Sequence, residues 1–453
     1  MNGTGPGGAR EGVPGASVDY GGVVDELVRG EWVEPGTGRR HGIPIDRIVI
    51  RASLEGAEAE LVARAHPGQS LTVVSDPRTH AALGGRVHRA LRADGVEVRE
   101  HVWSDPVCSD RGVAEIREAT AGTDALIAVG SGTINDTVKY AAFLDDRSYS
   151  VFPTSPMNAF TTSTASVTFD GLKRSITCRG ARGVFFDLSV LADCPKRLVS
   201  AAFADVICRT TAQADWLLSH LLLGTDYVDT PFALLAVDEP GMVRGAPALL
   251  AGDLDALGAL TRISALMGLG TTFTDTTHSG SMHEHMISHW IDMFAGDLHP
   301  GTSHGEQVGV ATVTMSDLHN RTFASETPPT LGPTEVPEAM LRERYPAEIA
   351  KGMIEQSRAK ALSAHAADAL NGKLDDGWPG IRERLREVVL PFDALWDAMG
   401  AAGCQRTATD LGLDVDFYRD AVANARWMRD RFGGLDLLGD AGGLERFVST
   451  MRV

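Results

Sequence analysis

Hydrophobic and polar positions follow two different patterns along the chain. Between Ile45 and about Val190, short β-branched runs alternate with stretches in which apolar residues recur at helical spacing. The predicted strands are Arg47–Ile50, Leu71–Val74, Val96–Val102, Ala125–Val129 and Ser150–Pro153, and the predicted helices are Ala57–Ala65 and His80–Asp94. This alternation predicts an α/β layer with a parallel sheet.

The pattern changes after this layer. Ser166–Asp170, Gly171–Arg174 and Ser175–Arg179 predict a hairpin at the sheet edge, followed by the apolar run Gly183–Asp187. From about Pro195 onward strand patterns disappear. Helical spacing predicts long helices there, at Lys196–Leu223, Asp253–Met267, His278–Phe294 and Pro346–Leu370, and a surface loop is predicted at Ala324–Pro337. We expect a glycine-rich disordered tail at residues 1–20, an α/β domain at 21–194 and an all-helical domain at 195–453.

A buried strand, a glycine turn and a helix start follow one another directly at Leu126–Ala142. In the turn, Gly130 and Gly132 permit backbone torsions that other residues avoid and let the main chain approach a phosphate. The N–H groups and dipole of the following helix supply positive charge. An ordinary tight turn has the same local features, so the turn indicates a phosphate cradle only together with other evidence.

Composition excludes several classes of protein. The chain has 453 residues, 43% of them hydrophobic, which is enough to fill two cores. Its net charge of −18, without a basic patch, disfavours a nucleic-acid partner. The five cysteines form no C-x-x-C pair, and no apolar run resembles a signal peptide or reaches the roughly 18 residues of a membrane span. We expect a cytoplasmic protein with no membrane partner.

Metal-ligand side chains occur in three helical segments of the second half. His285 and His289 are four residues apart and share a helix face, and His304 follows in S-H-G-E-Q-V-G-V, where we expect Gly305 to turn the chain into another helix. Asp205 lies in an otherwise apolar helix, where an unpaired carboxylate is costly. Two imidazoles and one carboxylate suit Zn²⁺ or Fe²⁺ and leave a coordination position open. Taken alone, each histidine fits an ordinary helix residue better than a metal ligand, and spacing does not show that Asp205 meets His285.

Together these motifs resemble one enzyme family. The two-domain plan, the G-S-G-T-I-N-D turn, the E-H-M-I-S-H and S-H-G-E-Q-V-G-V segments and the A-Q-A-D-W block at Ala212–Trp216 look like sn-glycerol-1-phosphate dehydrogenase. That family belongs to the superfamily of iron-containing alcohol dehydrogenases, glycerol dehydrogenase and 3-dehydroquinate synthase. The resemblance covers roughly Asp46 to the C-terminus, including Thr407–Leu413 and Ala423–Leu438.

The resemblance implies a fold, two cofactors and an activity. The fold is a Rossmann-like α/β domain with a parallel sheet followed by an all-α domain, as in dehydroquinate synthase. A nicotinamide nucleotide, NAD or NADP, would lie across the glycine turn, and Asp205, His285 and His304 would hold one divalent metal, Zn²⁺ with Fe²⁺ or Ni²⁺ as alternatives. Family members reduce dihydroxyacetone phosphate, so a small phosphorylated substrate would lie in the cleft between the domains. We also expect a homo-oligomer.

The resemblance assigns further residues to the nucleotide. Asp76 matches a carboxylate that approaches the adenosine ribose and favours NAD over NADP, although an aspartate that caps the next helix fits the sequence equally. Thr154 and Ser155 match a stretch beneath the cofactor, and Thr162 lies just beyond. The turn residues assigned to the nucleotide are Gly130, Ser131, Gly132, Thr133, Asn135 and Asp136.

Two positions depart from the family. Ala204 precedes Asp205 where a glycine is usual, which adds only a methyl group. Asn158, in P-M-N-A-F, stands where glycerol-1-phosphate dehydrogenases usually have the aspartate of S-M-D-G-Y, which touches the substrate hydroxyls. An amide cannot accept a proton at neutral pH, so His289 could pass the proton instead, or it packs behind the metal ligands. Asn158 and His289 are our candidate catalytic residues, and we expect little activity on dihydroxyacetone phosphate itself.

Three functions remain open from the sequence. The first is an NAD(P)-linked, metal-dependent reductase of a small phosphorylated ketone or aldehyde. The second is a relative of 3-dehydroquinate synthase, a lyase that uses the nucleotide transiently. The third is a non-catalytic binding or regulatory homologue, against which the retention of all three candidate metal ligands argues.

Overall fold

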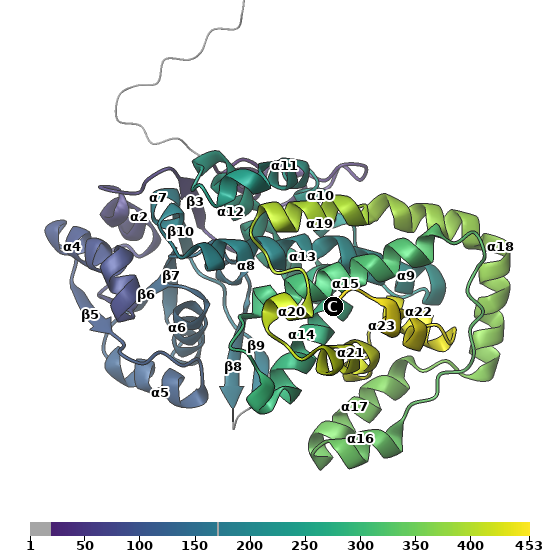
Figure 1. Ribbon diagram of the computed structural model, residues 1–453. Helices are drawn as coiled ribbons and strands as arrows, with labels where there is room; N and C mark the ends of the chain where they lie inside the picture. Colours follow the sequence, from purple (N-terminus) through teal and green to yellow (C-terminus); the bar gives the residue numbers. More distant parts are fainter. Residues whose placement is uncertain (1–19, 170–171) are drawn as a thin grey trace, which may run out of the picture.

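A six-stranded parallel sheet forms one end of the molecule (Figure 1). The computed structural model describes residues 20–169 and 172–453. The strand order is β3-β10-β7-β6-β4-β5, and every neighbouring pair is parallel, as the sequence pattern predicts. The strands are β3 Arg47–Arg51, β4 Leu71–Ser75, β5 Val98–Val102, β6 Ala125–Gly130, β7 Ser148–Pro153 and β10 Gly183–Asp187.

Alternate residues of the central strands face two apolar cores. In β6, Ala125, Ile127 and Val129 pack against α2 Glu58–Ala65 and α4 Gly85–Ala93, whereas Leu126 and Ala128 face the core shared with the helical half. Because side chains alternate along a strand, this burial of both faces makes β6 apolar throughout. The remaining elements before residue 195 are α1 Val23–Arg29, β1 Trp32–Val33, β2 Arg40–His41, α3 Pro77–Thr79, the π turn His80–Gly84, α5 Asp110–Ala119, α6 Gly132–Leu144, the 3₁₀ turn Asn158–Phe160 and α7 Leu188–Ala192.

The predicted hairpin exists, but it is not part of the sheet edge. β8 Thr164–Phe169 and β9 Leu172–Thr177 form an antiparallel pair of their own. β9 already begins at Leu172, so the predicted turn Gly171–Arg174 overlaps this strand, and residues 170–171 lie outside the described residues. Side chains of α6 explain the position of the hairpin, because Asp136 accepts a hydrogen bond from the Ser166 N–H at 3.0 Å and Lys139 donates to the Thr164 carbonyl at 2.8 Å.

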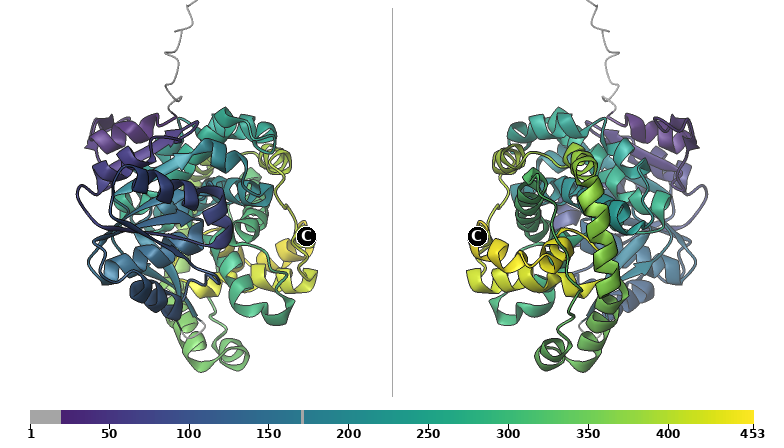
Figure 2. Two further views of the ribbon diagram at one scale, coloured as in Figure 1. Left: turned by 90° about the vertical axis from the view of Figure 1, so that its left-hand side faces the viewer. Right: turned by 90° about the vertical axis from the view of Figure 1, so that its right-hand side faces the viewer.

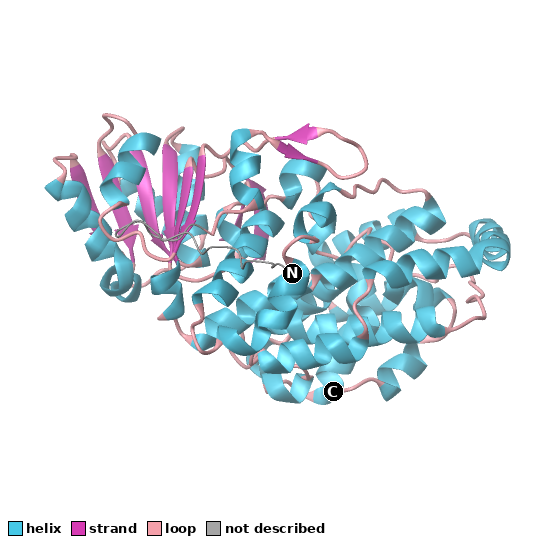
Figure 3. Ribbon diagram, turned by 90° about the horizontal axis from the view of Figure 1, so that it is seen from above, coloured by secondary structure: helices cyan, strands magenta, loops and turns pink. Residues whose placement is uncertain are grey.

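Among the described residues, the chain beyond residue 195 contains only helices, turns and loops, which fill the other end of the molecule (Figure 3). The long helix α18 runs along its outer side (Figure 2). The helices are α8 Lys196–Ile207, α9 Arg209–Leu223, α10 Thr230–Leu235, α11 Glu239–Leu249, α12 Leu254–Gly268, α13 Gly270–Thr274, α14 His283–Phe294, α15 His304–Ala324, α16 Glu338–Arg344, α17 Ala347–Lys360, α18 Ala364–Val388, α19 Phe392–Ala401, α20 Ala408–Leu411, α21 Val415–Asn424, α22 Gly434–Asp440 and α23 Leu444–Thr450, with 3₁₀ turns at His278–Gly280, Gly296–Leu298 and Ala425–Met428.

Two of the predicted long helices are interrupted by local hydrogen bonds. Lys196–Leu223 divides into α8 and α9 at Cys208, whose carbonyl accepts a hydrogen bond from the Thr211 hydroxyl at 2.9 Å; such back-bonding bends helices. Pro346–Leu370 divides because Ala361 is extended and Ser363 caps a new helix.

The helix predicted at His278–Phe294 begins only at His283. The Glu284 carboxylate accepts the Met282 N–H at 2.7 Å and thereby caps the start of α14. The loop predicted at Ala324–Pro337 lies between α15 and α16, as expected.

The two halves share one apolar core. It joins Leu27 of α1 and Ile50 of β3 to Leu260 of α12 and Leu395 of α19, while three further clusters of described residues lie in the helical half. The domain boundary at 194/195 stays a prediction, and the predicted tail falls outside the described residues except for Tyr20. No helix within the described ranges is both long and apolar enough to span a membrane.

Candidate active site

A cleft of about 1170 Å³ lies between the sheet and the helical half. The carboxyl ends of β6 and β7 meet at its floor, the usual place for a ligand in an open parallel sheet. Most of the predicted site residues line this cleft: Ser131, Gly132, Thr133, Asp136, Ser155, Asn158, Thr162, Asp205, His285, His289 and His304. Asp76, Gly130, Asn135 and Thr154 are not in its lining.

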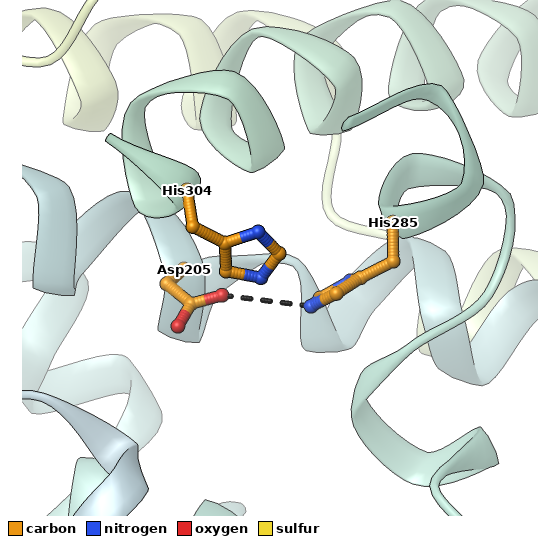
Figure 4. A group of neighbouring side chains, drawn as sticks. All are labelled: Asp205, His285 and His304. Atoms are coloured by element: carbon orange, nitrogen blue, oxygen red, sulfur yellow. Dashed lines mark ion pairs between the residues drawn. The ribbon is translucent and has the colours of Figure 1, made fainter. Parts of the chain in front are cut away.

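Asp205, His285 and His304 converge from three helices (Figure 4). A ligand atom of each lies within 4.8 Å of the other two, and Asp205 Oδ1 is 3.7 Å from His285 Nε2. Two glycines of α15 allow this approach. A Cβ at Gly305 would overlap the Ala201 carbonyl oxygen of α8, and one at Gly309 would lie 2.7 Å from the Ala204 Cβ. Gly305 is therefore a packing residue inside a helix and does not make the turn we expected.

Neighbouring polar groups fix the tautomers of the two imidazoles. His285 Nδ1 donates to the buried Glu284 carboxylate at 3.0 Å. Ser288 gives its hydroxyl proton to Gln307 Oε1 at 2.9 Å, so its oxygen accepts from His304 Nδ1 at 3.2 Å. With a proton on each Nδ1, each Nε2 carries a lone pair, which is the form that binds a metal. With the Asp205 carboxylate, the set fits one divalent cation.

Asn158 belongs to the same arrangement. Its Nδ2 donates to Asp205 Oδ2 at 2.9 Å, so the amide orients the carboxylate and still has its own oxygen available in the cleft. A charge-assisted hydrogen bond of this kind is stronger than one between neutral groups. The structure thus assigns Asn158 a contact with a predicted metal ligand, which the sequence did not reveal.

A second group, Cys208, Glu284 and His285, also has metal-ligating atoms close together. Burial, and then the charges of Glu284 and Asp205, raise the pKa of the Cys208 thiol well above its ordinary value. Its Sγ donates to the Gly280 carbonyl. A protonated thiol is a poor metal ligand, so the Asp205 group is the better candidate.

The glycine turn joins β6 to α6 at the rim of the cleft. Neither Gly130 nor Gly132 has a positive φ, so the expectation of unusual torsions is wrong. Gly130 is required for close packing, since a Cβ there would lie 2.7 Å from the Ile134 Cβ. Gly132 faces open space, because a Cβ added there would meet no atom within 4 Å, and Ser131 precedes the first turn of α6. Ser131, Gly132 and Thr133, where α6 begins, line the cleft, and the N-terminus of a helix is a suitable place for a phosphate.

Ser155 lies two residues beyond the end of β7 and lines the same cleft. Its hydroxyl is fully buried, lines the cleft and has no hydrogen-bond partner among the described residues. An unpaired buried hydroxyl is uncommon and indicates a missing partner such as a ligand. Thr162 also lines the cleft, where its hydroxyl pairs with that of Thr164 at 2.9 Å.

Several residues predicted to bind nucleotide have other contacts. Asp76 caps α3 by accepting the N–H groups of Arg78 and Thr79, at 2.8 and 3.1 Å. Asn135 is fully buried and donates to the Ala159 carbonyl at 3.0 Å, which ties α6 to the segment that carries Asn158. The contact of Asp76 with a ribose stays a prediction.

His289 lies beside the predicted metal ligands. Its ring stacks on that of His304, with centroids 5.7 Å apart, and is 6.2 Å from the ring of His285. It lines the cleft and is only partly buried. The arrangement is compatible with both alternatives, proton transfer and packing.

Sequence comparisons relate the chain to known dehydrogenases. The family model of iron-containing alcohol dehydrogenase matches residues 49–195. A glycerol-1-phosphate dehydrogenase (NAD(P)+) of Bacillus velezensis is 26% identical over 426 residues, which cover 92% of this chain and 96% of that protein. The protein of the same name from Bacillus subtilis is 28% identical over 287 residues, or 62% of this chain and 73% of the relative.

Solved structures show the same fold. A probable glycerol dehydrogenase from Sinorhizobium meliloti superimposes with a TM-score of 0.58 at 17% identity, covering 90% of this chain and 98% of that one. A 1,3-propanediol oxidoreductase gives 0.58 at 14% identity, with coverages of 89% and 98%. The chain resembles iron-containing alcohol dehydrogenases over residues 49–195, and glycerol-1-phosphate dehydrogenases over most of its length. Its parallel sheet followed by a helical half is the fold of these solved dehydrogenase structures.

The sequence motifs did not identify a group of buried charges that contacts α14 through His283. Asp215 contacts His283 and His319 at 2.9 and 2.8 Å, and Asp436 contacts His283 and Lys360 at 3.2 and 2.9 Å. Burial raises the pKa of Asp215, but the charges of His283 and His319 outweigh this and hold it well below its ordinary value. Asp215 lies in the A-Q-A-D-W block, which gives that motif a structural role.

Sequence reasoning also missed Arg429 and Arg431, which line the cleft. They lie within Ala423–Leu438, a segment noted for its resemblance but not for its charges. Hydroxyl-bearing residues of the loop before α14 were missed too, and they line the same part of the cleft: Thr276, Thr277, Ser279 and Ser281.

Proposed function

We propose that this chain reduces a small phosphorylated ketone, either dihydroxyacetone phosphate to glycerol 1-phosphate or a closely related pair. It is an NAD(P)-dependent dehydrogenase that resembles the iron-containing alcohol dehydrogenases. The observation that carries the proposal is the convergence of Asp205, His285 and His304 on the cleft that the glycine turn also faces. The relatives named glycerol-1-phosphate dehydrogenase supply the substrate class.

Asp205 Oδ1 and the Nε2 atoms of His285 and His304 would hold the divalent cation, with Zn²⁺ as first choice and Fe²⁺ or Ni²⁺ as alternatives. A cation at this position polarises the substrate carbonyl toward hydride attack. Glu284 and Ser288 keep the two imidazoles in the required tautomer, and Asn158 holds the carboxylate.

The sheet side of the cleft would bind the nucleotide. The backbone of Ser131 and Gly132 would donate to the pyrophosphate, and the buried Ser155 hydroxyl would gain the partner that it lacks. Asp76 remains the candidate for the ribose contact, and a carboxylate there would favour NAD over NADP.

Proton delivery and substrate orientation would come from two cleft residues. His289 would give a proton to the substrate oxygen as the carbonyl becomes a hydroxyl, a task for which an imidazole is suited near neutral pH. Asn158 would accept a hydrogen bond from a substrate hydroxyl through Oδ1, since its Nδ2 is engaged with Asp205.

Replacement of a metal ligand tests this proposal. We expect His304→Ala to lose its stoichiometric metal and at least ~100-fold in activity, whereas His365→Ala, which changes an exposed histidine outside the cleft, should lose neither. Metal analysis of the purified variants and oxidation of NADH or NADPH with a panel of phosphorylated ketones are the measurements. Full metal content in His304→Ala would show the assignment to be wrong. Turnover without loss of nucleotide absorbance would instead support the lyase.

We further propose that the protein is a cytoplasmic homo-oligomer. The described cysteines form no disulfide, which suits a reducing compartment. Light scattering coupled to size-exclusion chromatography measures the oligomeric state, and a monomer at all concentrations would contradict that part of the proposal.

A further inference from the structure

We propose that Arg429 and Arg431 form the subsite for the phosphate group of the substrate. The inference rests on the proposed function and specifies which residues recognise the phosphorylated end of the ketone. Both arginines line the cleft from the loop that follows the 3₁₀ turn Ala425–Met428. A guanidinium group suits this task because its planar set of N–H donors matches phosphate oxygens.

The two arginines carry positive charge in an acidic chain. The net charge is −18, and yet neither side chain has a carboxylate at ion-pair distance within the described residues. Arg426, three residues before Arg429, shows the contrast, since it pairs with Asp436 and Asp440. Burial lowers the pKa of Arg431 to about 10, so its guanidinium group stays charged at neutral pH. The pair therefore brings positive charge to the cleft wall that an anionic ligand can neutralise.

The position of Arg431 places the subsite near the metal ligands. Its Nη2 donates to the Thr277 hydroxyl at 2.7 Å, and its Nη1 donates to the Ser281 carbonyl. Ser281 lies four residues before His285 on the segment that enters α14. The Glu284 carboxylate, which holds His285, is close enough to act on Arg431 electrostatically.

The loop that carries the arginines is fixed by hydrogen bonds to α17 and α9. Lys360 Nζ donates to the Arg431 carbonyl at 3.0 Å, and the Gly434 N–H donates to Asp215 at 2.7 Å. Gly433 leaves no room for a side chain, because a Cβ there would lie 2.6 Å from Asp215 Cγ and 2.7 Å from the His283 ring. These buried contacts hold the loop in place before a ligand arrives, which lowers the entropic cost of binding.

The nucleotide also carries phosphates, but its cradle lies elsewhere. Gly132 and Ser155 are at the ends of sheet strands, whereas both arginines belong to the helical half and Arg431 touches the segment just before α14. Hydroxyls of Thr276 and Ser279 line the same part of the cleft and provide further donors. The arginines and these hydroxyls suit a phosphate monoester. Because they lie near the candidate metal ligands, we assign this phosphate to the substrate.

Arg429→Gln is the first test, because Arg429 is exposed and makes no structural contact that resembles those of Arg431. We expect its KM for dihydroxyacetone phosphate to rise about 10- to 100-fold, the range for a lost charge-assisted contact, while metal content and nucleotide affinity stay at the wild-type level. The ratio of kcat/KM for dihydroxyacetone phosphate to that for dihydroxyacetone should fall by the same factor. Arg431→Lys keeps the positive charge but loses the planar set of guanidinium N–H donors, so this ratio should fall by a smaller factor. Arg342→Gln, an exposed arginine of α16 outside the cleft, is the matched control.

Calorimetric titration with inorganic phosphate measures binding at this subsite directly, so it tests the inference without relying on the proposed activity. Phosphate binding to the metal-loaded wild type that is lost in Arg429→Gln would support the subsite even if no phosphorylated ketone were reduced. Equal phosphate affinity in both proteins would overturn it. A weaker affinity of Arg429→Gln for NADH or NADPH, with an unchanged KM for the ketone, would assign the arginines to the nucleotide and would overturn it as well.

Discussion

The sheet side and the helix side of the cleft, here called the sheet wall and the helix wall, offer different chemical groups to a ligand. The sheet wall (Ser131, Gly132, Thr133 and Ser155) offers backbone and hydroxyl groups, whereas the helix wall (Asp205, His285 and His304) offers charged or metal-ligating side chains. Behind the helix wall lies a second layer of buried charges around Asp215 and Asp436. A nucleotide can be held by exposed main chain, but a cation needs side chains held at fixed positions. The helix wall should therefore be coupled to stability, and the sheet wall to binding alone.

Loss of Asp215 should have the largest effect on the free energy of unfolding. Asp215→Asn would leave the buried His283 and His319 with no anion between them, and breaking a buried ion pair in this way typically costs about 3–5 kcal/mol. Urea denaturation measures the change. Asp145→Asn is the control on the sheet side, because its partners Arg117 and Arg147 are partly exposed and such pairs contribute about 0–1 kcal/mol. Equal losses in both variants would contradict the comparison.

Gly132→Val, on the sheet wall, should change nucleotide binding and leave the free energy of unfolding almost unchanged. A Cβ at Gly132 meets nothing within 4 Å, so the added side chain should fold without strain and project into the space for the pyrophosphate. We expect nucleotide affinity to fall about 10- to 100-fold, from lost charge-assisted N–H contacts, with little change in the free energy of unfolding.

Gly352→Val provides the matched control for this substitution. Gly352 lies in α17, also has open space around its Cβ position and is outside the cleft lining. Calorimetric titration with NADH and NADPH is the measurement. An unchanged affinity in Gly132→Val would place the nucleotide elsewhere.

The sheet wall was largely predictable from sequence because its signals are local. The strand, the glycine turn and the helix start at Leu126–Ala142 are contiguous, and the apolar pattern indicated the parallel sheet. The reason given for the glycines was wrong, since Gly130 and Gly132 have ordinary torsions and serve packing and access. Local pattern reveals where a turn lies, but not which neighbouring atoms make glycine necessary there.

The helix wall was predictable only through resemblance. His285 and His289 share a face by spacing alone, but the approach of Asp205 to His285 depends on how α8, α14 and α15 pack, which no local pattern encodes. For the same reason the sequence did not reveal the hydrogen-bond partners of the two imidazoles, Glu284 and Ser288, or the arginines of the C-terminal loop. Asn158 shows this most clearly, because its contact with Asp205 joins residues 47 positions apart in the chain.

The smallest expected effect concerns Asn158, where the two walls meet. In Asn158→Asp the Nδ2 donor to Asp205 is lost and two carboxylates face each other, a repulsion that a bound cation relieves. With saturating metal, a carboxylate in contact with a substrate hydroxyl should gain about 1.5–3 kcal/mol over an amide, and part of this gain is offset by the lost donor. We therefore expect about a tenfold higher kcat/KM for dihydroxyacetone phosphate in the metal-saturated variant. Asn158→Ala, which removes both contacts, should fall below the wild type. A wild-type kcat/KM equal to or above that of Asn158→Asp, at equal metal content, would mean that the amide acts only by holding Asp205 and would make dihydroxyacetone phosphate the ordinary substrate.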